Sequence, residues 1–138
     1  MGKRITELMT PNPRTIDQNK PVSDAAKMMR DEDVGVAPIV EDDKLIGMLT
    51  DRDIAIRVVA EGRNPDQVIV RDVASKQVVT IDPQQDLDEA LRIMAKHRVR
   101  RLPVVEEDGK LVGVVAQADV ARKGDDTKTG KLVEEISQ

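Results

Sequence analysis

The chain contains an internal repeat, and this repeat limits the folds open to it more than any other feature of the sequence. Thr15-Ile16-Asp17 recurs as Thr80-Ile81-Asp82, about 65 residues further along the chain. The correspondence runs through both copies. One extra residue, Gly109, falls in an acidic turn of the second copy, where a loop tolerates a change of length. The 138 residues therefore contain two copies of one small supersecondary unit.

Each copy has the pattern of a β-α-β-β-α unit. In the first copy, apolar residues at helical spacing (Val22, Ala25, Ala26 and Met29) predict a helix, and an acidic turn joins two apolar strands after it. Asp86, with Glu89 three residues later, predicts a capping box in the second copy. The expected strands are 36–40, 45–49, 102–105 and 111–115. Further helices are expected at 5–9, at 70–74, and from Asp51 and Gln117 onward.

A unit of about fifty residues buries too little apolar surface to be stable alone. We therefore expect an α+β fold in which the two copies pack about a pseudo-two-fold axis, with a cleft between them that favours a binding function. The predicted segments are 4–62 for the first motif, 63–69 for a linker, 70–123 for the second motif and 124–138 for a tail. In the tail, Leu132, Val133 and Ile136 suggest a short helix.

Composition excludes several classes of function. Without cysteine and with one histidine, the chain has no disulfide, no thiol catalysis and no multi-histidine metal site of its own. Its formal net charge is −4 and it has no Phe, Tyr or Trp, which argues against nucleic acid as a partner. No apolar run approaches the roughly 20 residues of a membrane helix, and we see no secretion signal, so a cytoplasmic protein with no membrane partner is expected.

Two segments resemble a known family. Gly47-Met48-Leu49-Thr50-Asp51-Arg52-Asp53 resembles the Gly-h-h-Thr/Ser-x-x-Asp signature of the cystathionine β-synthase (CBS) domain, where h is apolar. Val99-Arg100-Arg101-Leu102-Pro103-Val104-Val105 resembles the strand that precedes that signature. The resemblance covers about residues 4–123, as a tandem CBS pair without a further domain.

The resemblance implies a stand-alone regulatory module, often called a Bateman module, that senses a ligand and is not an enzyme. Such pairs usually form homodimers and bind adenosine derivatives in the cleft between the motifs. AMP, ADP or ATP is the expected ligand, with NAD and S-adenosylmethionine as alternatives, and no catalytic cofactor is expected. An unidentified effector protein would respond to the bound state.

Thr50 and Asp53 are the first candidates for ligand contact. The resemblance implies that Asp53 accepts hydrogen bonds from both ribose hydroxyls and that Thr50 touches the sugar or a phosphate. The same two residues also fit a helix cap. The second copy retains Asp119 as a ribose ligand but has Ala116 in place of Thr50, which departs from the family pattern and puts a second pocket in doubt.

The basic run from Lys96 to Arg101 is the expected anion site. Arg100 and Arg101 stand where several nucleotide-binding CBS motifs place phosphate-binding residues, and an arginine fork fits phosphate oxygens. Arg98 and Arg52 are further candidates for phosphate contact. The alternative is a basic helix end, which is how we interpret His97.

The adenine is expected to lie against aliphatic segments, which the resemblance implies act largely through their backbone groups. These residues are Thr15, Ile16, Val36 and Pro38 in the first copy and Thr80, Ile81 and Pro103 in the second. The alternative is that the same residues only build the core.

Two other functions stay open. A structural or protein-interaction dimer with an empty cleft is favoured by Ala116 and by Gly35, the first-copy counterpart of Arg100. A weaker alternative is nucleic-acid binding through the basic run. The acidic turns lack the ligand spacing of a calcium loop, so no metal site is predicted. Asp51 and Asp53 have no nucleophile or orienting base beside them, so no catalytic residues are predicted.

Overall fold

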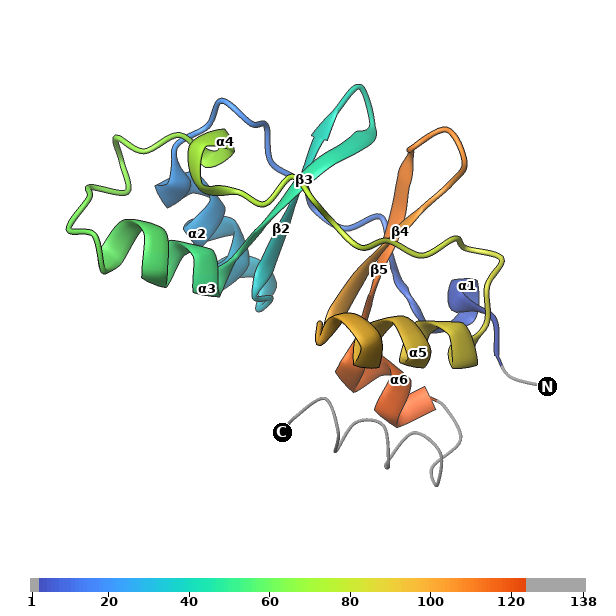
Figure 1. Ribbon diagram of the computed structural model, residues 1–138. Coiled ribbons are helices and arrows are strands. Elements are labelled where there is room, and N and C mark those ends of the chain that lie inside the picture. The colour runs from blue at the N-terminus through green and yellow to red at the C-terminus, as the bar shows by residue number, and fades with distance from the viewer. Residues whose placement is uncertain (1–2, 124–138) are drawn as a thin grey trace. The chain divides into compact units, whose positions relative to one another are not determined.

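The computed structural model describes residues 3–123, and the chain divides into two compact units (Figure 1). The first-repeat unit is Arg14–Val78, and the second-repeat unit combines Met1–Pro13 with Val79–Gln138. None of the helices in the described part is long and apolar enough to cross a membrane. The predicted tail, 124–138, lies outside the described residues.

A two-stranded antiparallel sheet and its helices form the first-repeat unit. Its elements are α2 (Val22–Glu32), β2 (Val36–Glu41), β3 (Lys44–Thr50), α3 (Asp51–Ile54), the π-helical segment η1 (Ala55–Val59) and α4 (Val70–Val73). Two single bridges widen the sheet. Ile16 lies parallel beside Ile39 of β2, and Ser75 lies antiparallel beside Met48 of β3.

The second-repeat unit repeats this plan. Its elements are α1 (Ile5–Leu8), β1 (Thr10–Pro11), α5 (Leu87–His97), β4 (Arg101–Val105), β5 (Leu111–Ala116) and α6 (Gln117–Lys123). The sheet order is β1-β5-β4, with antiparallel pairs, and Ile81 lies parallel beside Val104 of β4. The α+β class and the β-α-β-β-α pattern of both copies are confirmed.

The segment that leads into each repeat packs in the unit of the other repeat. Ile5 donates its backbone N–H to the carbonyl of Gln85 (2.9 Å), and Val70 donates to the carbonyl of Lys20 (2.9 Å). Figure 1 shows α1 beside α5 and β5 in one unit and α4 beside β3 in the other. Ile5 and Leu8 are fully buried in the core of the second-repeat unit. A sequence repeat and a compact unit are therefore different divisions of this chain.

Each unit has its own aliphatic core, in keeping with the absence of aromatic residues. The first-repeat core consists of Ile16, Val22, Ala25, Met28, Met29, Ala37, Ile39, Leu49, Val58, Val68, Val70 and Val73. The second-repeat core consists of Ile5, Leu8, Ile81, Leu87, Ala90, Leu91, Met94, Leu102, Val104, Val115 and Val120.

The observed elements agree closely with the predicted ones, although the sequence does not predict β1 or the π-helical form of η1, and two details of α2 and α5 also differ. Met28, not Ala26, belongs to the fully buried face of α2. The box predicted at Asp86 forms only in half: Asp86 accepts from the N–H of Glu89 (3.0 Å), while the Glu89 carboxylate accepts from Arg92. The side-chain hydrogen bond from the Arg92 guanidinium lowers the pKa of Glu89.

Truncating Ile5 tests the crossed packing. We expect Ile5→Ala to lower the free energy of unfolding by about 2–5 kcal/mol, because a fully buried side chain leaves a cavity. By hydrogen exchange, amides of α5, β4 and β5 should lose protection more than those of α2 and β2.

Val70→Ala is the matched control, because Val70 is fully buried in the first-repeat core. Its loss of protection should centre on α2 and β3. If Ile5→Ala instead lowered the protection of the first-repeat amides most, the assignment of α1 to the second-repeat unit would be wrong.

Candidate ligand-binding site

A reciprocal hydrogen-bonded cap begins the last helix of the first-repeat unit. Thr50 Oγ1 accepts from the N–H of Asp53 (3.1 Å), and Asp53 Oδ2 accepts from the N–H of Thr50 (3.0 Å). Both residues are half-buried. The alternative interpretation of this pair as a helix cap is thus confirmed.

The cap leaves part of the Asp53 carboxylate unused. Its bond to Thr50 is made through Oδ2, and within residues 3–123 Oδ1 has no hydrogen-bond partner. An ionised carboxylate has about four lone-pair sites, so one cap bond does not exhaust it. Capping and acceptance from a ligand hydroxyl are therefore compatible at Asp53.

Strand register brings other predicted residues near this cap. Val36 pairs with Thr50 across the β2–β3 ladder, and Pro38, two residues further along β2, shares a face with Val36. The carbonyl of Pro38 accepts from the N–H of Ile16 (3.0 Å). Val36, Pro38 and Ile16 are buried, and Thr15 is exposed. The side chain of Ile16 belongs to the core and its N–H is bonded to Pro38, which matches the alternative interpretation for that residue.

The second-repeat unit builds the same local structure with different side chains. Arg101 pairs with Ala116 across the β4–β5 ladder, and Ala116 donates its N–H to Asp119 Oδ2 (3.2 Å). Ala116 has no hydroxyl, so only half of the reciprocal cap forms. The other oxygen, Asp119 Oδ1, accepts from Arg122 (2.8 Å).

The predicted phosphate-binding arginines surround the start of β4. Arg98 ends α5 in the left-handed conformation (φ 54°), and the carbonyl of Arg100 accepts from the N–H of Gln117 (2.7 Å). Arg98 and Arg100 are exposed, and Arg101 is half-buried. In the described part of the chain, none of these three guanidinium groups has an ion-pair or hydrogen-bond partner, and neither has the exposed Arg52. These cations are therefore available to an anion.

The remaining predicted residues of the second copy divide between core and surface. Ile81 and Pro103 are buried, and Ile81 donates its N–H to the carbonyl of Pro103 (3.0 Å). Thr80 is exposed, as is His97 at the last position of α5. The side chain of Ile81 belongs to the core, which matches the alternative interpretation for that residue.

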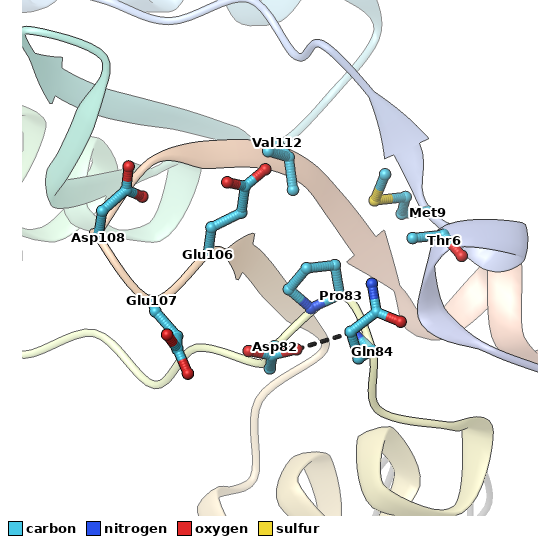
Figure 2. Close-up of a pocket in the computed structure, with 9 residues that line it drawn as sticks. All are labelled: Thr6, Met9, Asp82, Pro83, Gln84, Glu106, Glu107, Asp108 and Val112. Carbon is cyan, nitrogen blue, oxygen red and sulfur yellow. Dashed lines mark hydrogen bonds between the residues drawn. The ribbon is translucent and has the colours of Figure 1, made fainter.

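A pocket of about 660 Å³ lies elsewhere in the second-repeat unit (Figure 2). Its lining residues are Thr6, Met9, Asp82, Pro83, Gln84, Glu106, Glu107, Asp108 and Val112. No predicted ligand residue lines it. The sequence does not predict this pocket, because three segments far apart in the chain meet there, although one of them is the acidic turn of the second copy. Four carboxylates and no basic group line it, so it is unsuited to a phosphate.

The caps of the two units allow a reciprocal stability test. We expect Thr50→Ala to destabilise the protein by about 1 kcal/mol, because the N–H of Asp53 loses its acceptor. Ala116→Thr should stabilise it by a similar amount, since the half-cap at Asp119 would then be completed. Urea unfolding followed by circular dichroism measures both changes. If the two variants changed the free energy of unfolding in the same direction, the interpretation of the caps would be wrong.

Comparisons with known proteins agree with this architecture. A family model for the CBS domain matches residues 5–60 and again residues 70–126. The CBS domain-containing protein YhcV of Bacillus subtilis (strain 168) is 42% identical over 117 residues, which is 85% of this chain and 82% of that protein.

Two solved structures extend the comparison. The crystal structure of Hypoxic Response Protein I with two coordinated zinc ions superposes with a TM-score of 0.79 and 36% identity, covering 87% of this chain and 98% of that one. Among residues 3–123 of this chain, no group of three or more His, Asp or Glu side chains could hold a metal ion. The crystal structure of CBSX2 in complex with AMP has a TM-score of 0.74 and 25% identity, covering 88% and 95% of the two chains.

The signature from Gly47 to Asp53, the repeated β-α-β-β-α structure and the two family matches lead to one conclusion. This chain belongs to the CBS domain family, as a tandem pair of CBS motifs.

Proposed function

We propose that the chain is a non-catalytic regulatory module that binds an adenosine nucleotide and changes its interaction with an effector protein when the ligand is bound. The observation that carries this proposal is the partly unused carboxylate of Asp53, which the cap bonds to Thr50 hold beside the first residues of β2. A ligand can shift such a module between conformations only by binding one of them more tightly.

The carboxylate of Asp53 suits a ribose. Its Oδ1 can accept a hydroxyl hydrogen atom while Oδ2 keeps its bond to Thr50. Hydrogen bonds to an ionised acceptor are stronger than neutral ones. Thr15 and the strand residues Val36 and Pro38 lie on the same unit and supply aliphatic and backbone contacts for the base.

The unpaired arginines suit the phosphates. Most other arginines of the described chain are engaged: Arg14 and Arg30, for example, form ion pairs with Glu32 and Asp31. Arg100 and Arg101 have no ion-pair partner within residues 3–123, in a chain whose net charge is −4. A structural neighbour solved with AMP supports the choice of an adenosine nucleotide, and AMP is the ligand we would test first, followed by ADP and ATP.

Isothermal titration calorimetry with AMP tests the proposal. We expect Asp53→Asn to weaken binding by about tenfold or more, because a hydrogen bond to a charged group is worth about 1.5–3 kcal/mol. The amide keeps an oxygen that can accept from Thr50, so the cap should survive. Asp51→Asn is the matched control. Asp51 is exposed and its carboxylate accepts from the N–H of Arg52, so this variant should bind AMP normally.

Repeating the titrations with 2′-deoxy-AMP identifies the group that Asp53 contacts. If Asp53 accepts from the ribose 2′-hydroxyl, Asp53→Asn and the removal of that hydroxyl should together reduce the binding free energy by less than the sum of their separate effects. Additive losses would place the contact elsewhere. No heat change with AMP, ADP, ATP, NAD or S-adenosylmethionine would overturn the sensor proposal.

That negative result would favour the second candidate function, a structural or protein-interaction module. The complete cap at Thr50 and Asp53 favours this alternative, because it explains both residues without a ligand. Salt-sensitive retention on single-stranded DNA would instead favour nucleic-acid binding through the basic run.

We also propose that the chain forms a homodimer. Three large apolar side chains of the first-repeat unit are exposed: Val34 at 45%, Ile56 at 46% and Val59 at 66%. Ile56 and Val59 both belong to the π-helical segment η1, and Val34 follows the end of α2.

Light scattering tests the dimer. We expect the wild-type chain to have twice the monomer mass and Val59→Asp to have the monomer mass, because a charge opposes burial of that surface. Glu61→Gln, nearby and also exposed, is the control and should remain dimeric. A monomeric wild-type protein would exclude this role for Val59.

A further inference from the structure

The two units present the same carboxylate with different electrostatic surroundings. In both, the N–H of the residue before the last helix donates to Oδ2 of the aspartate three positions later, at 3.0 Å for Asp53 and 3.2 Å for Asp119. The first residue of the last helix also makes the same backbone bond in both units. Asp51 donates its N–H to the carbonyl of Gly35, just before β2, and Gln117 donates to the carbonyl of Arg100, just before β4. Differences in binding between the units must therefore come from side chains.

The decisive side chain is three residues after each aspartate. Arg122 donates to Asp119 Oδ1 at 2.8 Å, whereas the residue three positions after Asp53 is Ile56, which cannot donate a hydrogen bond. Together, Arg122 and the N–H of Ala116 engage both oxygens of Asp119. The side chain of Asp119 is only 13% exposed and that of Arg122 is 71% exposed. Most of the aspartate is therefore covered, while the arginine can move into solvent.

We propose that Arg122 competes with the ribose for Asp119, so that the second-repeat unit is the weaker of two nonequivalent nucleotide sites. This inference rests on the proposed function, since it concerns how the same ligand would distribute between the units. A hydroxyl that approached Asp119 would have to displace a charge-assisted bond, whereas at Asp53 it meets a carboxylate oxygen that has no partner within residues 3–123. Arg122 acts through Asp119 and is a positioning residue.

The competition is expected to be moderate. Because the arginine is largely exposed, solvent screens the ion pair and its loss is inexpensive. We therefore expect removal of Arg122 to tighten the second site about two- to fivefold, which corresponds to an ordinary exposed ion pair. The missing hydroxyl at Ala116 should keep this site weaker than the first even then.

Calorimetry with AMP in two backgrounds tests the inference. The wild-type chain should show one tight and one weak site, and Arg122→Ala should strengthen only the weak one. In Asp53→Asn, which weakens the first site, adding Arg122→Ala should still strengthen the remaining site by the same factor. Arg122→Lys keeps a charge near Asp119, so its second site should bind AMP with an affinity between those of the wild-type chain and Arg122→Ala.

Arg92→Ala is the matched control, because Arg92 also pairs with an acidic residue three positions away in the same unit. It should change neither affinity. A tight site that binds normally, with a second site unaffected by Arg122→Ala, would overturn the inference and leave the proposed function standing. Two equal sites in the wild-type chain would do the same. Absence of AMP binding would overturn both.

Discussion

The structure depends on the burial of apolar surface that neither repeat could bury with its own residues alone. A unit of about fifty residues has too little interior for an independent core. Here the lead-in segment of each repeat supplies the missing surface to the other: Ile5 and Leu8 enter one core, and Val68, Val70 and Val73 enter the other. These contacts also extend each sheet by a strand or a bridge, through β1 in one unit and Ser75 in the other.

The same exchange explains a glycine in each sheet. A β-carbon at Gly47 would lie 2.9 Å from the carbonyl oxygen of Ser75, and one at Gly113 would lie 3.0 Å from that of Thr10. Both glycines therefore let the added segment approach the strand closely. The glycine that opens the family signature thus has a structural reason in this chain, independent of any ligand.

Duplication gives the two units a common backbone and leaves their side chains free to differ. Thr50 and Asp53 form a complete cap, whereas Ala116 and Asp119 form half of one, with Arg122 on the remaining oxygen. The positive charge, by contrast, is on the second unit, since Arg100 and Arg101 stand where the first copy has Gly35 and Val36. Within residues 3–123, the aspartate with a free oxygen and the arginines without partners therefore belong to different units, and the proposed difference between sites rests on the two aspartates alone.

The sequence by itself determined the repeat, the elements and the family, because these depend on local patterns. Helical spacing from Val22 to Met29, the apolar strands and the cap before Asp53 are properties of neighbouring residues, and the observed elements follow them closely. Only the tertiary structure decided that Ile5 belongs with Leu87 and that an acidic pocket forms beside Asp82. Those outcomes depend on which distant segments meet, and spacing along the chain does not specify this.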